Sequence, residues 1–211
     1  MKNIERFIID ITGSSGSGKT TAAKHIGKKY NFSVLYSGLL FRYAAKVLLS
    51  KKPKNQIKFL KNKFLKLNYE KVKKMSLHTP EISIYTAHIA KKLAIRKIIK
   101  SFQISYIKRK KKVVLEGRDG SKIFPKANVK FYVVCSPLKI AANRRLKQIK
   151  KVNKKITFKE VLKDLKKRDF MDKNRKHSKL ERHPESVYIN TAKLSINGVI
   201  KKMCSVINTQ I

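Results

Sequence analysis

Short apolar segments that alternate with helical patterns predict an α/β domain with a parallel sheet. Four runs rich in β-branched residues are the predicted strands, at residues 7–11, 113–115, 129–135 and 186–189. Helical periodicity fills the intervals between them. Because parallel strands are joined by crossover connections, usually helices, this order of segments favours a parallel sheet.

Capping residues mark where several helices begin. Thr79 precedes Pro80 and Glu81, a combination of capping oxygen, first-turn proline and first-turn carboxylate that is typical of a helix start. The apolar face behind this start consists of Ile82, Tyr85, Ile89 and Leu93. We therefore expect Arg96 to lie on the same helix.

Two more helices are predicted from similar signals. One starts at Ser136-Pro137, and the capping-box pair of Thr157 and Glu160 predicts another. The Lys-rich segment 46–76 and the polar segment 147–185 have weaker apolar periodicity. We expect these two segments to be peripheral.

The charge of the chain is extreme for its size. The 211 residues include 53 Lys and Arg against 12 Asp and Glu, a formal charge of +41. Such a field attracts polyanions, so nucleic acid must be considered as a partner. However, 43 of the basic residues are Lys spread along the whole chain, and only 10 are Arg. We interpret the excess as a solvated surface that binds polyanions non-specifically, without a specific nucleic-acid site.

No feature predicts secretion, a membrane span or a disulfide framework. Glu5, Arg6 and Asp10 interrupt the N-terminal apolar stretch, unlike a signal peptide, and no run of 18 apolar residues follows. Cys135 lies in an apolar run and is expected to be buried, and Cys204 is the only other cysteine. We expect a cytoplasmic protein.

The stretch GSSGSGKT at residues 13–20 matches the complete G-x-x-x-x-G-K-[ST] pattern of a phosphate-binding loop. Its glycines let backbone N–H groups face a phosphate at the start of a helix. Lys19 can then reach the β- and γ-phosphates, and the Thr20 hydroxyl is placed to ligate Mg²⁺. The predicted contacts of the triphosphate are Gly13, Ser14, Ser15, Gly16, Ser17, Gly18, Lys19, Thr20 and Thr21.

Kinases, GTPases, motors and helicases share this loop. A GTPase would carry an N-K-x-D segment and a D-x-x-G switch, and neither follows the loop. Motors and helicases need more elements than this chain holds. A kinase that phosphorylates a small acceptor therefore remains.

A phosphate acceptor needs Arg side chains, because a guanidinium binds two oxygens at once. Four Arg-bearing segments are candidates: YSGLLFR at 36–42, Arg96, EGRD at 116–119 and RDFMDKNR at 168–175. The EGRD segment follows a predicted strand, which is where open α/β sheets bind ligands.

These segments, in this order, resemble the bacterial cytidylate kinases, a branch of the nucleoside monophosphate kinases. The resemblance covers most of the chain and is specific at GSSGSGKT, SGLLFR, EGRD with the following FP, RDFMDKNR and INTAKLSI. It implies a three-layer P-loop kinase fold with helices on both faces of the sheet. It also implies one domain over residues 1–211, with a monophosphate-binding insertion near 39–108 and a lid near 145–180.

The resemblance implies that a monomer converts ATP and CMP or dCMP into ADP and CDP or dCDP, with Mg²⁺. Ser37, Arg96 and Asp119 would read the pyrimidine ring, whose edge requires both donors and acceptors. Arg42 and Arg118 would clamp the acceptor phosphate.

Further residues are implied near the sugar and the phosphates. Arg168, Asp172 and Arg175 resemble lid-side residues, and their spacing places them on one helix face, where an ordinary surface ion-pair ladder is the alternative. Arg144 and Arg145 stand where the lid begins, and one of them is expected to touch the transferred phosphoryl group. The residues implied in catalysis are Lys19, Arg118, Arg145 and Arg175.

The chain departs from the family's pattern at several positions. Glu116 stands where the family has Asp and could hold Mg²⁺ through water. Ala87 replaces a sugar-contacting Ser, which leaves the choice between CMP and dCMP open. Met171 replaces a basic lid residue, and the segment 118–124 is one residue short.

Two other interpretations stay open from the sequence. One is a kinase for another acceptor, such as AMP or UMP. The other is a basic nucleic-acid-binding module that retains the loop, although repeated aromatic platforms for base stacking are absent.

Overall fold

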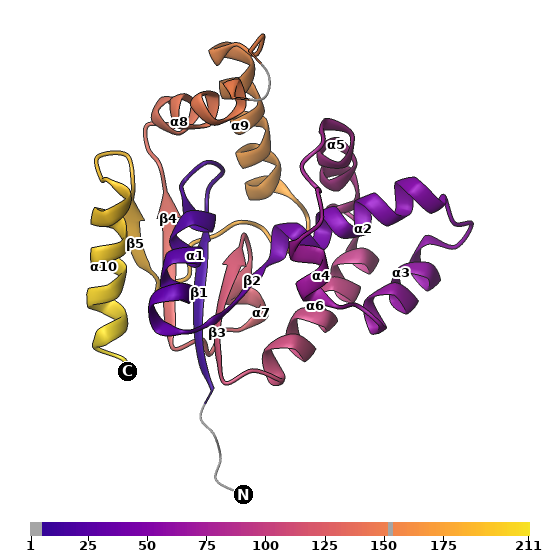
Figure 1. Ribbon diagram of the computed structural model, residues 1–211, viewed down its shortest axis with the longest axis horizontal. Coiled ribbons are helices and arrows are strands. Elements are labelled where there is room, and N and C mark those ends of the chain that lie inside the picture. The colour runs from indigo at the N-terminus through magenta and orange to yellow at the C-terminus, as the bar shows by residue number, and fades with distance from the viewer. Residues whose placement is uncertain (1–5, 152–153) are drawn as a thin grey trace, which may run out of the picture. The chain divides into compact units, whose positions relative to one another are not determined.

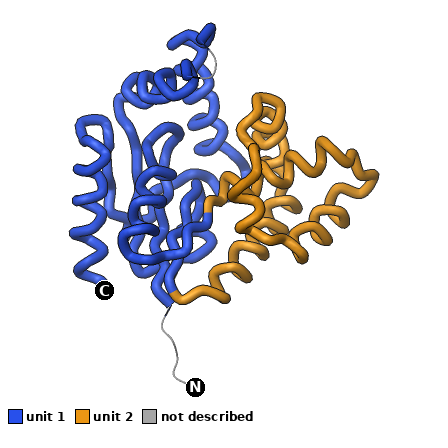
Figure 2. The backbone as a smooth tube through the Cα atoms, in the orientation of Figure 1, with its two compact units in different colours: residues 1–35, 112–211 blue, residues 36–111 orange. Residues whose placement is uncertain are grey.

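The computed structural model describes residues 6–151 and 154–211 (Figure 1). The chain forms two compact units, coloured separately in Figure 2. Residues 1–35 and 112–211 form the sheet unit, and residues 36–111 form the helical unit. Residues 152 and 153, which belong to the predicted lid, lie outside the described residues. Within the described ranges, no helix is long and apolar enough to cross a membrane.

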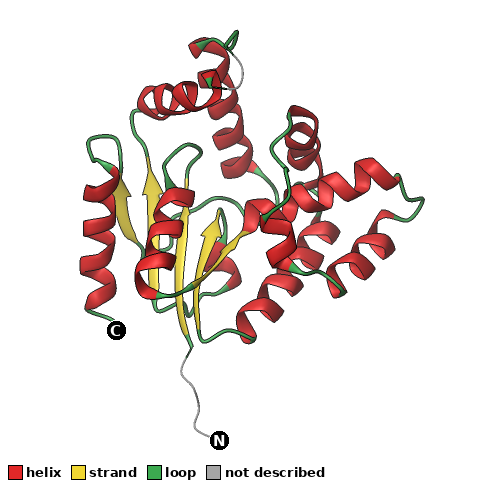
Figure 3. Cartoon of the chain, in the orientation of Figure 1, coloured by secondary structure: helices red, strands yellow, loops and turns green. Residues whose placement is uncertain are grey.

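The sheet unit is built on five strands in the order β2-β3-β1-β4-β5 (Figure 3). The strands are β1 (Phe7–Gly13), β2 (Ser33–Tyr36), β3 (Lys112–Gly117), β4 (Val129–Val134) and β5 (Val187–Asn190). β1 pairs in parallel with β3 on one side and β4 on the other, and β5 pairs in parallel with β4. The predicted α/β class with a parallel sheet is confirmed.

Helices follow the strands as the alternating sequence predicts. Those of the sheet unit are α1 (Lys19–Tyr30), α7 (Gly120–Ile123), α8 (Leu138–Lys150), α9 (Phe158–Asn174) and α10 (Ile196–Asn208). α1 packs against β3 and α10, and α7 packs against β1 and β3. The predicted capping box at the start of α9 is confirmed, since Thr157 and Glu160 exchange both hydrogen bonds.

α8 and α9 pack side by side around a small apolar cluster of their own (Figure 1). Its buried members are Cys135, Ala141, Ala142, Val161 and Leu165. Cys135 is therefore a small buried side chain, as its apolar run predicts. The segment 147–185, which the sequence marks as polar, thus contributes Val161 and Leu165 to an apolar cluster.

The helical unit consists of five helices. They are α2 (Ser37–Lys51), α3 (Gln56–Leu65), α4 (Tyr69–Lys73), α5 (Pro80–Ile89) and α6 (Leu93–Lys108). The segment that the sequence marks as peripheral contributes buried rings: Phe64 lies 5.8 Å from Phe102 and Tyr69 lies 5.2 Å from Tyr106, centroid to centroid. Each aromatic side chain buries a large apolar area, and the aliphatic residues Leu60 and Val72 of the same segment are fully buried as well.

The prediction that Arg96 lies on the helix started by Thr79 is wrong. Thr79 does cap α5, because its hydroxyl accepts the N–H of Ile82 at 3.2 Å. That helix ends at Ile89, however, and the chain is extended at Lys92 before α6 begins. Arg96 lies on α6, and its guanidinium donates to the Ala90 carbonyl at 3.0 Å. This bond satisfies a carbonyl at the end of α5, where helix carbonyls lose their partners.

We expect Phe131→Ala to lower the free energy of unfolding by about 3–5 kcal/mol. Phe131 is fully buried on β4, a strand paired on both sides. Chemical denaturation measures the loss, with Ser205→Ala at an exposed position of α10 as the control, which should change the free energy by less than about 0.5 kcal/mol. Equal effects of the two changes would contradict this account of the core.

Candidate active site

The phosphate loop connects β1 to α1 through residues 14–18. At Gly13 the backbone approaches β4 so closely that a Cβ atom would lie 1.8 Å from the Val133 oxygen. The Ser14 N–H donates to that same carbonyl at 3.1 Å. Gly18, with φ of 88°, caps α1 in the left-handed region that glycine favours. The first N–H groups of α1 are thereby directed to an anion-binding position.

Lys19, the loop lysine, is turned back onto its own loop. Its ammonium donates to the Ser14 carbonyl at 2.5 Å and to the Ser17 hydroxyl at 3.3 Å. Burial, followed by the nearby Arg118 cation, lowers the pKa of Lys19 to about 7. The carboxylates that oppose this lowering are Glu116, Asp169 and Asp172. A phosphate in the loop would add negative charge and favour the charged ammonium.

Arg118 joins three parts of the sheet unit. Its guanidinium donates to the Gly13 carbonyl and, at 2.8 Å, to the Ser15 hydroxyl. It also pairs with the Asp172 carboxylate of α9 at 3.1 Å. The sequence-predicted residues Arg118 and Asp172 are thus brought together at the phosphate loop.

Asp169 is a site residue that the sequence reasoning missed. Its carboxylate accepts the Ser15 N–H at 2.7 Å, which links α9 directly to the phosphate loop. Asp169 lies beside Arg168 and three residues before Asp172. An acidic residue is rare in this basic chain, and its position inside the RDFMDKNR segment was the available signal.

The remaining lid-side residues are only partly gathered. Arg175 donates to Asp172 at 3.0 Å, although Arg175 is extended and lies just past the end of α9 rather than on its face. Arg168 instead lies 3.7 Å from Asp164 one turn earlier, an ion pair within the helix. Arg145 is exposed and donates to Gln148 at 3.3 Å. The structure therefore groups Arg175, but not Arg168 or Arg145, with Arg118.

Arg144 donates its hydrogen bonds mainly to the backbone of the loop that follows β5. Its guanidinium donates to the carbonyls of Thr191, Ala192 and Leu194 at 2.8, 3.2 and 3.3 Å. The Thr191 hydroxyl in turn donates to the Ser17 carbonyl at 3.1 Å. Arg144 thus stabilises the loop after β5, and of the two neighbouring arginines Arg145 is the exposed one.

Three predicted acceptor residues lie in the helical unit. Ser37 begins α2, and its buried hydroxyl accepts a hydrogen bond from Gln103 at 2.8 Å. Arg42 donates to the Leu77 carbonyl at 3.1 Å and to the Ser83 hydroxyl at 2.8 Å. The third, Arg96, has its guanidinium 5.2 Å from the centre of the Phe41 ring.

Asp119 lies next to a buried network that begins at Asp10. Asp10, on β1, is fully buried and accepts the hydroxyls of Thr12 at 2.9 Å and Ser121 at 2.5 Å. Burial raises the pKa of Asp10 to about 7; the two hydroxyls lower it, the Asp119 charge raises it further, and Lys130 lowers it. Asp119 itself is buried and precedes α7.

The donor atoms near the loop suit a hard cation. Thr20 carries a hydroxyl at the start of α1, and Glu116 carries a buried carboxylate near the end of β3. Mg²⁺ prefers oxygen ligands and usually keeps several waters beside one or two carboxylates. The described residues contain no group of three or more His, Cys, Asp or Glu that could hold a metal alone. The loop fits Mg²⁺ brought with a phosphate rather than a protein cage.

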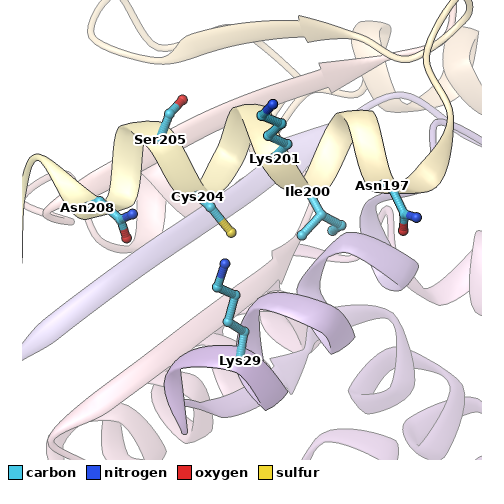
Figure 4. A pocket seen from close by; sticks show the side chains of 7 residues that line it. All are labelled: Lys29, Asn197, Ile200, Lys201, Cys204, Ser205 and Asn208. Atoms are coloured by element: carbon cyan, nitrogen blue, oxygen red, sulfur yellow. The ribbon is translucent and has the colours of Figure 1, made fainter.

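An open pocket of about 450 Å³ lies elsewhere in the sheet unit, between α1 and α10 (Figure 4). Its lining residues are Lys29, Asn197, Ile200, Lys201, Cys204, Ser205 and Asn208. None of them belongs to the predicted site. The pocket therefore lies apart from the residues that the sequence predicts for the site.

Comparison with known proteins identifies the family of the chain. The cytidylate kinase family profile matches residues 9–209. The chain belongs to the cytidylate kinase family. The cytidylate kinase of Fervidobacterium nodosum is 31% identical over 210 residues, with 94% of this chain and 95% of that protein covered. The cytidylate kinase of Fusobacterium nucleatum subsp. nucleatum is 33% identical over 217 residues, covering 93% and 95%.

Solved structures agree on the fold of this cytidylate kinase family member. The shikimate kinase of Bacteroides thetaiotaomicron superimposes with a TM-score of 0.52 over 96% of this chain and 98% of that one, at 13% identity. At such low identity the likeness shows the fold alone. The predicted P-loop kinase fold is confirmed, and as a cytidylate kinase family member the protein is a phosphotransferase.

We expect the free energy of unfolding to fall as the pH rises from about 4 to about 7, because of Asp10. Because its folded pKa is raised to about 7, the folded protein keeps a proton there that the unfolded chain releases. The contribution is on the order of 1–4 kcal/mol across this window. Denaturation at pH 5 and pH 8 should show a flatter dependence in Asp10→Asn than in the natural protein. An identical pH slope in both proteins would refute this interpretation of the buried carboxyl.

Proposed function

We propose that the protein transfers the γ-phosphoryl group of Mg²⁺-bound ATP to CMP or dCMP, giving ADP and CDP or dCDP. The observation that carries the proposal is a complete phosphate loop with a buried lysine, Lys19, in a chain that matches the cytidylate kinase family over residues 9–209. The relatives named cytidylate kinase support the acceptor. Nucleotides are thus the partners we expect, in a monomer that has no specific nucleic-acid site.

The donor binds at the loop in this proposal. Backbone N–H groups from the loop and the start of α1 hold the β-phosphate of ATP, in the segment Gly13 to Thr21. Lys19 exchanges the Ser14 carbonyl for phosphate oxygens, an exchange favoured because an ionised phosphate oxygen attracts the ammonium more strongly than a neutral carbonyl does. Thr20 and, through water, Glu116 would hold Mg²⁺, which supplies positive charge to the transferring phosphoryl group.

Two of the acceptor residues that we propose belong to the sheet unit. From the sheet unit, Arg118 would hold the acceptor phosphate and Asp119 would accept a hydrogen bond from the cytosine. Arg118 now pairs with Asp172, so an acceptor phosphate would compete with a carboxylate of similar charge and shape.

In the helical unit, Arg42 would bind the acceptor phosphate, while Ser37 and Arg96 would read the base. Arg42 is held by a carbonyl and a hydroxyl, both neutral acceptors that a phosphate outcompetes. Arg96 is fixed on α6 by the Ala90 carbonyl and the Phe41 ring, which limits its freedom before the ligand arrives. Ala87 of α5 has no polar side-chain atom, so we propose that both CMP and dCMP are accepted.

Phosphoryl transfer requires no covalent intermediate with the protein. A phosphate monoester has a second pKa of about 6, so its oxygen is ionised near neutral pH and needs no general base. Arg118, Arg145 and Arg175 would stabilise the charge that develops on the transferred group. Closure of the segment 145–180, with Arg168 and Asp172 toward the nucleotides, would exclude water and so favour the acceptor over hydrolysis.

The first test offers CMP, dCMP, UMP, AMP and GMP separately with ATP and Mg²⁺, and measures the ADP formed. We expect turnover to be fastest with CMP or dCMP and to fall by roughly 100- to 1000-fold or more in Lys19→Ala. Lys201→Ala, on the exposed face of α10, is the matched control and should keep full turnover. Faster turnover with AMP or GMP, or an unaffected Lys19→Ala enzyme, would refute the proposal.

A second test addresses the base-reading role of Arg96. We expect Arg96→Met to raise the KM for CMP by about 10- to 100-fold, because a bond from a charged donor is lost, and to leave the KM for ATP unchanged. Arg109→Met at the exposed end of the same helix is the control and should leave both values unchanged. Steady-state kinetics at varied ATP and CMP measure both constants. A rise in the KM for ATP alone would remove Arg96 from the acceptor site.

A further inference from the structure

The phosphoryl-transfer chemistry leaves one fully buried acid unexplained. Asp10 lies on β1, three residues before the phosphate loop, and its two carboxylate oxygens each accept a hydroxyl. One hydroxyl comes from Thr12 on the same strand, and the other comes from Ser121 on α7. A buried carboxyl is costly unless its oxygens are hydrogen-bonded, so this arrangement is built around both of them.

A second hydrogen bond joins β1 to α7. The Gly120 N–H donates to the Thr12 hydroxyl oxygen at 3.2 Å, while that hydroxyl donates its own proton to Asp10. A Cβ atom at residue 120 would lie 1.8 Å from an Asp10 carboxylate oxygen, so only glycine permits the approach. Two hydrogen bonds and one close backbone approach therefore hold residues 120 and 121 against β1.

The segment held in this way directly follows Arg118 and Asp119. α7 is only four residues long, and a helix that short is not stable by itself. The position of residues 118–119 therefore depends on how α7 is attached to β1. Because β1 continues into the phosphate loop, the attachment also sets where these two residues lie relative to the loop.

We propose that Asp10 is a positioning residue that, through Thr12 and Ser121, aligns the segment 118–119 with the phosphate loop for phosphoryl transfer. This inference rests on the proposed function, in which Arg118 and Asp119 bind the acceptor. A carboxylate suits the task because it offers two acceptor oxygens. Asparagine offers one oxygen and a donor, so one of the two hydroxyls would have to turn away. An apolar side chain would leave both buried hydroxyls without their acceptor.

The kinetic test removes one hydroxyl at a time. Thr12→Val keeps the shape of the side chain and removes the bridge, whereas Thr12→Ser keeps the hydroxyl. We expect Thr12→Val and Ser121→Ala to raise the KM for CMP about 10-fold, while the KM for ATP changes less than about twofold. Thr12→Ser should restore most of the acceptor affinity, and Ser205→Ala on α10 is the matched serine control. Equal increases in both KM values, or unchanged values, would overturn the inference.

A second measurement does not depend on activity. Hydrogen exchange of the natural protein and of Thr12→Val, both without nucleotide, reports the attachment itself. We expect the amide of Gly120 to exchange at least about 10-fold faster in the variant, because its acceptor is gone, with the increase confined to residues 118–124. Unchanged exchange there would overturn the inference even if CMP is not the acceptor. Absent CMP kinase activity in the natural protein, by contrast, would refute only the proposed function.

Discussion

The close approach of β1 to β4 at Gly13 is the constraint on which the site depends. With no side chain at Gly13, the Ser14 N–H reaches the Val133 carbonyl, and the chain leaves the sheet beside the end of β4. The parallel register brings the carboxyl ends of β1, β3 and β4 to one edge. Arg118 after β3 and Thr191 after β5 can therefore both bond to backbone carbonyls of the loop region, those of Gly13 and Ser17.

Charge at this edge is arranged differently from charge in the rest of the chain. The protein has only 12 acidic residues against 53 basic ones, yet Glu116, Asp169 and Asp172 all act on Lys19. In a chain with such a positive field, a local group of carboxylates balances the buried Lys19 and the partly buried Arg118. The scarce acids are therefore more informative about the site than the abundant lysines. The same balance means that phosphates enter a site whose cations already have partners.

Local sequence signals were reliable where backbone preference alone decides the structure. The glycines of the loop, the capping box before α9 and the proline start of α5 were all predicted, because each acts within one turn of the chain. The break between α5 and α6 was not predicted, since neither glycine nor proline marks it. There the apolar period continues across two helices, and the Arg96 bond to Ala90 completes the end of the first.

The sequence by itself determined the fold class, the phosphate loop and the family of this protein, because these follow from periodicity and contiguous motifs. Only the tertiary structure decided which charged groups meet. Asp169 reaches Ser15 across 154 positions, and Asp10 binds Ser121 across 111. Arg144 turned out to hold the loop after β5. Such contacts follow from the packing of strands and helices that are distant along the chain, so a pattern of neighbouring residues cannot predict them.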